Sequence, residues 1–101
     1  MTSNLFAGSA QWDAAMTSYK DKNWKDAIEL FSNIDKNSDE YATAQRYIGY
    51  NIYGRELNNW NKAVDHCILA YQANPKDEKV LEDFTRAVAN IKSIKMQNER
   101  K

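Results

Sequence analysis

The chain has 101 residues, of which 43% are hydrophobic, and this suffices for one small domain with a single core. Its 14 basic and 14 acidic residues cancel, which argues against the basic surface that non-specific nucleic-acid binding requires. A single cysteine excludes an internal disulfide, and no apolar run matches a membrane span or a signal peptide. We therefore expect a cytoplasmic protein without cofactor or metal, and with neither nucleic acid nor a membrane as its partner.

The charges are distributed unevenly along the chain. Residues 1–40 carry four lysines and seven acidic residues, whereas residues 76–101 carry seven basic and five acidic residues. This asymmetry can orient a partner or a second copy of the chain, although solvation of helix surfaces is the simpler explanation.

The hydrophobic pattern is helical along most of the chain. Residues 1–8 are small and polar around Leu5 and Phe6, and we expect them to form a flexible lead-in. Apolar side chains then recur every three or four residues, which predicts helices at about residues 9–20, 24–35, 38–54, 60–73 and 78–95. Residues 96–101 lose the pattern and are expected to fray. The sequence thus predicts an all-α, antiparallel helix-turn-helix array of five helices in one domain, residues 9–95.

Individual residues indicate where helices begin and where they meet. Asn23 can cap the helix that follows it, and Ser38 with the acidic residues after it provides another helix start. Gly49 lies inside a periodic segment, where glycine costs about 1 kcal/mol relative to alanine. We therefore expect a neighbouring helix to approach closely at Gly49, and the chain to leave the helix near Gly54.

Two parts of the chain repeat each other. Residues 24–31 (WKDAIELF) return in reduced form as residues 60–64 (WNKAV), each with an aromatic residue three positions before an alanine. On a helix these two side chains share one face, so the alanine admits a neighbouring helix and the ring covers the edge of the contact. The helices before the two copies also align, because Ala15 and Gly49 are 34 residues apart and Thr85 occupies the same place in a third version.

These residues resemble the tetratricopeptide repeat (TPR), a helical hairpin with a period of about 34 residues. The strongest match is the segment from Tyr19 to Phe31 (YKDKNWKDAIELF), and the resemblance covers most of residues 9–94. It implies two repeats and a C-terminal capping helix. The sequence departs from the family pattern at Gln11, Lys22 and Cys67, and the spacing from Trp24 to Trp60 is 36 residues.

In that family the first helices of successive repeats line a concave groove, which implies where a partner would bind. The residues at these positions combine aromatic rings with charged groups: Trp12, Met16, Tyr19, Lys20, Arg46, Tyr47, Tyr50, Tyr53, Glu82 and Arg86. Aromatic rings and guanidinium groups are frequent in recognition surfaces. For Tyr19, Tyr47 and Tyr53 the alternative is that their rings fill gaps between helices. We expect Trp12 and Tyr50 to be exposed.

His66 and Cys67 are the residues most able to carry chemistry, but neighbours on a helix point about 100° apart and do not meet easily. With no second histidine or cysteine, we expect Cys67 to be a small core residue and His66 a surface residue. We found no phosphate-binding loop or nucleophile motif either. The chain is therefore not expected to be an enzyme.

Two hypotheses about function remain open at this stage. The first is a TPR-like adaptor or chaperone that binds a peptide or helix of another protein in an aromatic groove. The second is a self-assembly module in which the open side of the stack or the fifth helix packs against a second copy of the chain.

Overall fold

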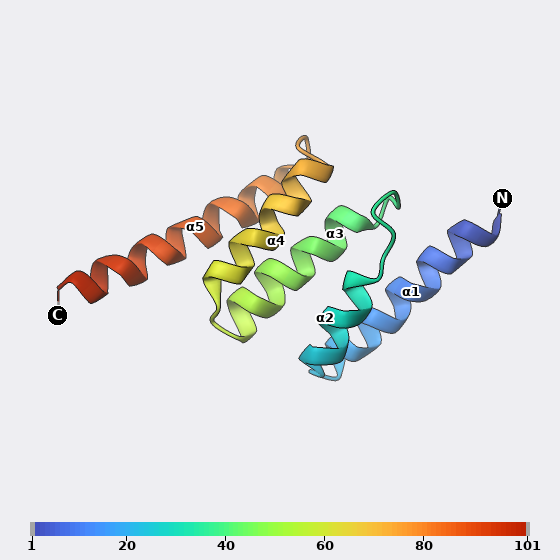
Figure 1. Ribbon diagram of the computed structural model, residues 1–101, viewed down its shortest axis with the longest axis horizontal. Helices are drawn as coiled ribbons and strands as arrows, with labels where there is room; N and C mark the ends of the chain where they lie inside the picture. Colours follow the sequence, from blue (N-terminus) through green and yellow to red (C-terminus); the bar gives the residue numbers. More distant parts are fainter. Residues whose placement is uncertain (1, 101) are drawn as a thin grey trace.

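The computed structural model describes residues 2–100, with side chains described from Ala10 onward. Every regular element in this range is a helix: α1 (Thr2–Lys20), α2 (Trp24–Ser32), α3 (Tyr41–Arg46), η1 (Tyr47–Glu56), α4 (Trp60–Ala73) and α5 (Glu78–Glu99). The α3 helix continues directly into η1, a wider π-helical stretch, so the two form one rod (Figure 1). The predicted all-α array of five helices is confirmed.

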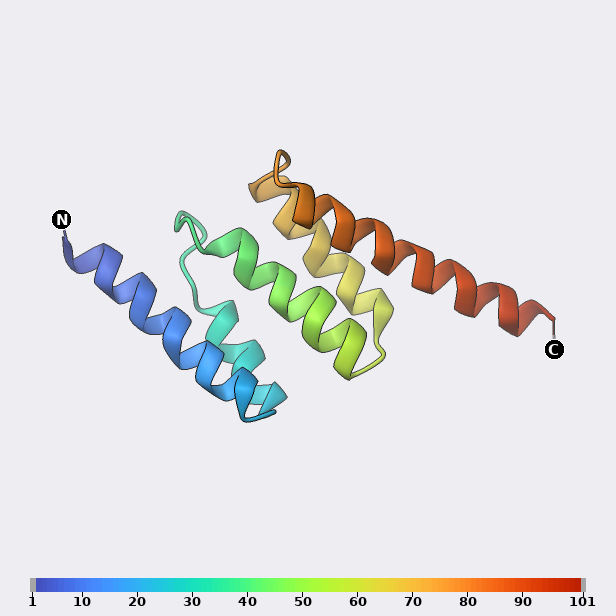
Figure 2. The same cartoon turned by 180° about the vertical axis from the view of Figure 1, so that it is seen from behind.

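The helices lie in one extended row, and consecutive helices run in opposite directions (Figure 2). The array measures 56 × 30 × 15 Å, and α1 and α5 lie at its opposite ends. The α1 helix pairs with α2, the α3/η1 rod pairs with α4, and α5 packs against α4. Most packing is thus between helices that are adjacent in the sequence, as in repeat architectures.

Both end helices are longer than the sequence predicted. The α1 helix begins at Thr2, so residues 2–8, which we expected to be a flexible lead-in, are helical. The α5 helix continues to Glu99 instead of ending near residue 95. Neither segment contains proline, and the end of α5 consists mainly of good helix formers, so the backbone stays helical after the apolar pattern stops.

The predicted helix starts are close to the observed ones but use different hydrogen bonds. Asn23 is the N-cap of α2, yet its side-chain amide donates to Oδ2 of Asp26 (2.8 Å) and does not cap a backbone N–H. The Ser38 hydroxyl accepts from the N–H of Glu40 (3.0 Å), but α3 begins three residues after Ser38, at Tyr41.

The first of two cores joins α1, α2 and the α3/η1 rod. Ala15 and Ala27 are completely buried, and Phe31, Ile48 and Ile52 fill the space around them. Burial of each of these large side chains contributes roughly 1.5–3 kcal/mol to stability. This core therefore fixes the first hairpin against the second.

The second core is smaller and lies between η1, α4 and α5. Its buried members are Ala63, Cys67 and Ala87. A Cβ added at Gly49 would lie 2.7 Å from the carbonyl oxygen of Ala63, so the expected close helix approach at Gly49 is confirmed. Gly54 lies two residues before the end of its helix, since η1 continues to Glu56. The Trp60 ring lies directly against Gly54.

Candidate functional site

The aromatic residues predicted on α1 and η1 interlock with those of α2. The Trp12 ring centroid lies 5.3 Å from that of Phe31 and 5.4 Å from that of Tyr47, both in edge-to-face geometry. Tyr19 makes the same kind of contact with Trp24 (5.5 Å) and with Tyr47 (5.3 Å). These separations and angles are the favoured ones for aromatic pairs, each worth about 0.5–1.5 kcal/mol beyond area burial.

This interlocking leaves little of the predicted α1 surface free. Trp12, Met16, Tyr19 and Tyr47 are all half-buried and pack against the first core, whereas Lys20 is exposed. The expectation that Trp12 is exposed is wrong, because its indole fills the space between α2 and η1. The amide of Asn51 also donates to the Tyr19 hydroxyl (3.5 Å), which links α1 to η1.

The two remaining tyrosines of η1 contact α4. The Tyr50 ring is 5.7 Å from the Trp60 ring and is half-buried, so its expected exposure is also wrong. The Tyr53 ring stacks on the His66 imidazole at 5.6 Å, and Nζ of Lys62 lies 5.2 Å from the Tyr53 centroid. The η1 tyrosines therefore hold α4 in place through their rings.

An ion pair joins α3 to α5. Nε of Arg46 donates to Oδ2 of Asp83 at 2.8 Å, and the Asp83 side chain is only 8% exposed. Asp83 was not among the residues predicted from the sequence to bind a partner. Asp83 lies three residues after Val80 and four before Ala87, both buried, and this spacing is the signal that puts it on the inward face.

The charged residues Glu82 and Arg86 remain accessible on α5. They form an exposed ion pair of 2.7 Å, one helical turn apart. The Tyr50 hydroxyl and then the Glu82 carboxylate raise the pKa of Arg86, which places the guanidinium beside Tyr50. Tyr50, Glu82 and Arg86 are thus predicted site residues that the structure brings together, while Lys20 lies apart from them on α1.

His66 and Cys67 have different surroundings. Nδ1 of His66 donates to Oε1 of the buried Gln45 at 2.7 Å, and burial lowers the pKa of His66. The expectation of a surface histidine is therefore wrong. Cys67 is buried as expected, and burial, followed by the charge of Asp83, raises the pKa of its thiol to about 11. A thiol with this pKa is protonated at neutral pH and is a poor nucleophile.

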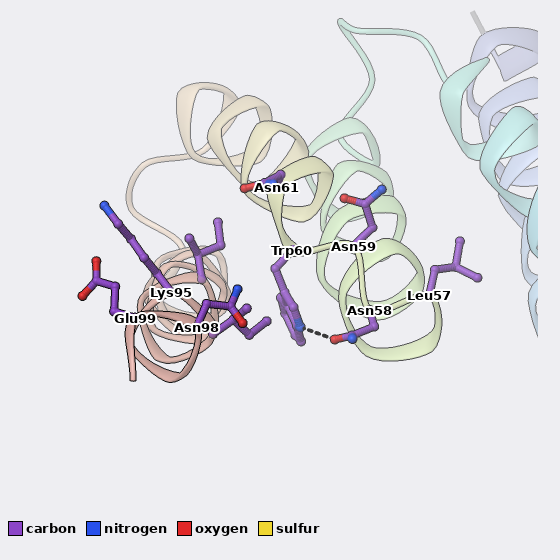
Figure 3. A pocket seen from close by; sticks show the side chains of 10 residues that line it. Leu57, Asn58, Asn59, Trp60, Asn61, Lys95, Asn98 and Glu99 are labelled. Carbon is purple, nitrogen blue, oxygen red and sulfur yellow. Dashed lines mark hydrogen bonds between the residues drawn. The ribbon is translucent and has the colours of Figure 1, made fainter. Parts of the chain in front are cut away.

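The structure also contains a groove that the sequence analysis did not predict. Its volume is about 720 Å³, and it separates the turn between η1 and α4 from the C-terminal half of α5 (Figure 3). Leu57, Trp60, Ile91 and Ile94 give it apolar surface. Figure 3 shows the Trp60 ring between the α5 helix and Asn58, whose side-chain oxygen accepts a hydrogen bond from the indole N–H at 3.0 Å.

The rim of this groove is polar and close to neutral. Four carboxamides surround it, from Asn58, Asn59, Asn61 and Asn98, together with one cation and one anion, Lys95 and Glu99. The α5 helix is longer than α4, and its apolar residues Ile91 and Ile94 lie on the inward face past the point where α4 begins at Trp60. Apolar residues without a facing helix were the signal in the sequence for a groove.

Comparisons of this chain with protein-family models, with curated proteins and with solved structures find no match. Among the side chains of residues 10–100, no three His, Cys, Asp or Glu residues are grouped so that they could hold a metal ion. None of the helices between residues 2 and 100 combines the length and the apolarity needed to cross a lipid bilayer.

Proposed function

We propose that this chain is a non-catalytic interaction module of the tetratricopeptide type, an adaptor or chaperone that binds a peptide or helix of another protein in the cytoplasm. The observation that carries the proposal is the groove of about 720 Å³ between the η1–α4 turn and α5. Its volume falls within the range of sites that accept a ligand or a few peptide side chains. The groove continues the predicted site, because Tyr50 packs against Trp60 on its wall.

The chemistry of the groove suggests the kind of segment that binds there. An apolar wall with an indole favours one or two large aliphatic or aromatic side chains. The carboxamides on the rim can donate hydrogen bonds to a peptide backbone and accept hydrogen bonds from it, so the ligand does not need a charge. The proposed ligand is therefore a nearly uncharged, amphipathic segment whose apolar residues enter between Trp60 and Ile94.

The predicted site residues take separate roles in this proposal. Tyr50 packs against Trp60 on the groove wall. Glu82 and Arg86 form an exposed ion pair beside Tyr50 and can contribute hydrogen bonds and charge to an incoming segment. Arg46 is already engaged by Asp83. The rings of Trp12, Tyr19, Tyr47 and Tyr53, with Met16, support the helices that carry the groove.

A peptide-library selection against the purified chain, followed by calorimetric titration of the selected peptides, tests the proposal. We expect Ile94→Asp to weaken binding by tenfold or more, because a carboxylate would be desolvated by an apolar ligand. Leu69→Asp is the matched control, since Leu69 is an exposed aliphatic residue of α4 that does not line the groove. Equal binding by wild type and Ile94→Asp would refute the site.

A further inference from the structure

The two hairpins differ in the number of residues that lead from the first helix to the second. Trp24 lies nine residues after Ala15 in the first hairpin. Trp60 lies eleven residues after Gly49, the counterpart of Ala15 in the repeat pattern. The second hairpin thus contains an insertion of two residues between Gly49 and Trp60.

The insertion is not in the turn between the helices. Both turns contain three residues, 21–23 after α1 and 57–59 after η1. In each turn the middle residue has a positive φ, 62° at Lys22 and 53° at Asn58, so the two turns correspond residue for residue. The two extra residues therefore lie in the helix before the turn, which is η1.

The backbone hydrogen bonds show how η1 takes up the extra residues. The N–H groups of Asp21 and Asn23, after α1, donate to carbonyls four and five residues earlier. The corresponding N–H groups of Leu57 and Asn59, after η1, donate to carbonyls five and six residues earlier. A π-helix of ten residues makes about two turns, each with roughly one residue more than an α-helical turn. The π-helical stretch therefore accounts for both inserted residues.

The change of helix type gives the two tryptophans different neighbours. The Trp24 ring contacts Tyr19 of its own hairpin at 5.5 Å and packs against the first core. Tyr53 lies 34 residues after Tyr19 and is its counterpart, but the Tyr53 ring stacks on His66. The corresponding tyrosine is thus directed toward the middle of α4 and away from its first residue, Trp60.

Trp60 lies where η1 is widened. Its ring meets the Tyr50 ring at 5.7 Å, and a Cβ added at Gly54 would lie only 2.8 Å from its Cε3 atom. Gly54 is the counterpart of Lys20, the last residue of α1, and any larger residue there would displace the indole. The same ring lines the groove, and its N–H is held by Asn58 (Figure 3).

We infer that the two-residue insertion in η1, together with Gly54, places the Trp60 ring in the groove and thereby controls the affinity of the groove for its ligand. In an α-helix without the insertion, Tyr53 would meet Trp60 as its counterpart meets Trp24, and the groove would lose its indole. The effect on binding rests on the proposed function, whereas the position of the ring does not.

Deletion of Arg55 and Glu56 tests this inference, because it gives η1 the length of the corresponding part of α1. Both side chains are exposed, so the deletion removes no core side chain. Nuclear Overhauser contacts of the Trp60 ring should connect it to Tyr50 in the wild type and to Tyr53 in the deletion variant. We expect the affinity for the selected peptides to fall tenfold or more.

The matched control keeps the length of η1 and removes the same two side chains. Arg55→Ala combined with Glu56→Ala should retain the ring contacts and the peptide affinity of the wild type. A loss of affinity in this control equal to that of the deletion variant would assign the effect to the two side chains, and this result would overturn the inference.

Gly54→Ala is a second test that leaves the chain length unchanged. The added Cβ should push the Trp60 ring away from Tyr50 and weaken peptide binding tenfold or more. Alanine is a better helix former than glycine, so helix formation itself does not oppose this variant. Circular dichroism should show that its helix content equals that of the wild type.

The outcomes separate the position of the ring from the function of the groove. A folded deletion variant in which Trp60 still contacts Tyr50, or which binds peptide like the wild type, would overturn the inference. If the deletion variant does not fold, unchanged ring contacts or unchanged affinity in Gly54→Ala would overturn it. A wild type that binds no peptide would refute the groove hypothesis, while the ring contacts would still decide what places Trp60.

Discussion

The first hairpin, α1 with α2, has a large ring at its completely buried centre, whereas the second, the α3/η1 rod with α4, has only small residues there and keeps its rings half-buried beside them. Phe31 stands four residues after Ala27 and is completely buried between two other aromatic rings. Cys67 stands four residues after Ala63 in the same place of the second copy, beside the Arg46–Asp83 ion pair. The same alanine-centred contact thus has a completely buried ring beside it in one unit, and a small thiol with close backbone approach in the other.

Truncation at these equivalent positions tests the comparison most directly. We expect Phe31→Ala to lower the free energy of unfolding by about 3–5 kcal/mol, because it leaves a large cavity among aromatic rings. Cys67→Ala removes one sulfur atom and should cost about 1 kcal/mol. Urea denaturation of both variants measures the difference. Similar losses at the two positions would mean that the units are stabilised alike.

The ion pair distinguishes the second unit from the first. Arg46→Ala leaves the carboxylate of Asp83 buried without a partner and should cost about 3 kcal/mol, near the low end for buried pairs because Arg46 keeps 18% side-chain exposure. Replacing both residues, as Arg46→Met with Asp83→Leu, should recover most of the loss. A double variant as unstable as Arg46→Ala alone would show that apolar side chains cannot replace the ion pair.

Gly49 tests the close approach of η1 and α4. Helix propensity alone favours alanine over glycine by about 1 kcal/mol, so Gly49→Ala would raise the melting temperature if the site had room. The added Cβ would meet the backbone oxygen of Ala63 at 2.7 Å, and backbone cannot move as a flexible side chain does. We therefore expect a net loss of about 1–3 kcal/mol, measured by thermal unfolding monitored with circular dichroism.

The histidine of the second unit predicts a pH dependence. The folded-state pKa of His66 is lowered by burial, so the unfolded chain binds a proton more readily than the folded chain. Stability should be full above the unfolded pKa of about 6.5 and should decline as the pH falls from there toward the folded pKa. His66→Gln should lose less stability than wild type between pH 7.5 and pH 5.5 in urea titrations. Parallel curves for the two proteins would contradict this assignment.

The sequence predicted the number and order of the helices because its apolar residues recur with helical spacing and its turns are polar. It also located the close approach at Gly49, since only a packing requirement explains glycine inside so regular a helix. Helix ends were predicted less well. The terminal turns of α5 are held by backbone hydrogen bonds and propensity, which leave no apolar signature.

The candidate site was only partly predictable. A ring placed on a groove-facing position by the repeat pattern can turn toward a neighbouring helix, and Trp12 does so toward Phe31. That choice depends on the space left by residues about twenty positions away, which periodicity does not describe. Asp83 and Gln45 were missed for a different reason. Their spacing from buried residues placed them inward, but their polarity argued for solvent until the partners Arg46 and His66 were known.

The buried thiol of Cys67 can be used to measure local opening of the helices around it. With a pKa of about 11 in the closed state, the thiol reacts with an alkylating reagent only when α4 separates from its neighbours and water enters. At high reagent concentration the modification rate is the opening rate, and at low concentration it reports the opening equilibrium. Because the chain has a single cysteine, mass spectrometry can follow the alkylation of Cys67 without any added label.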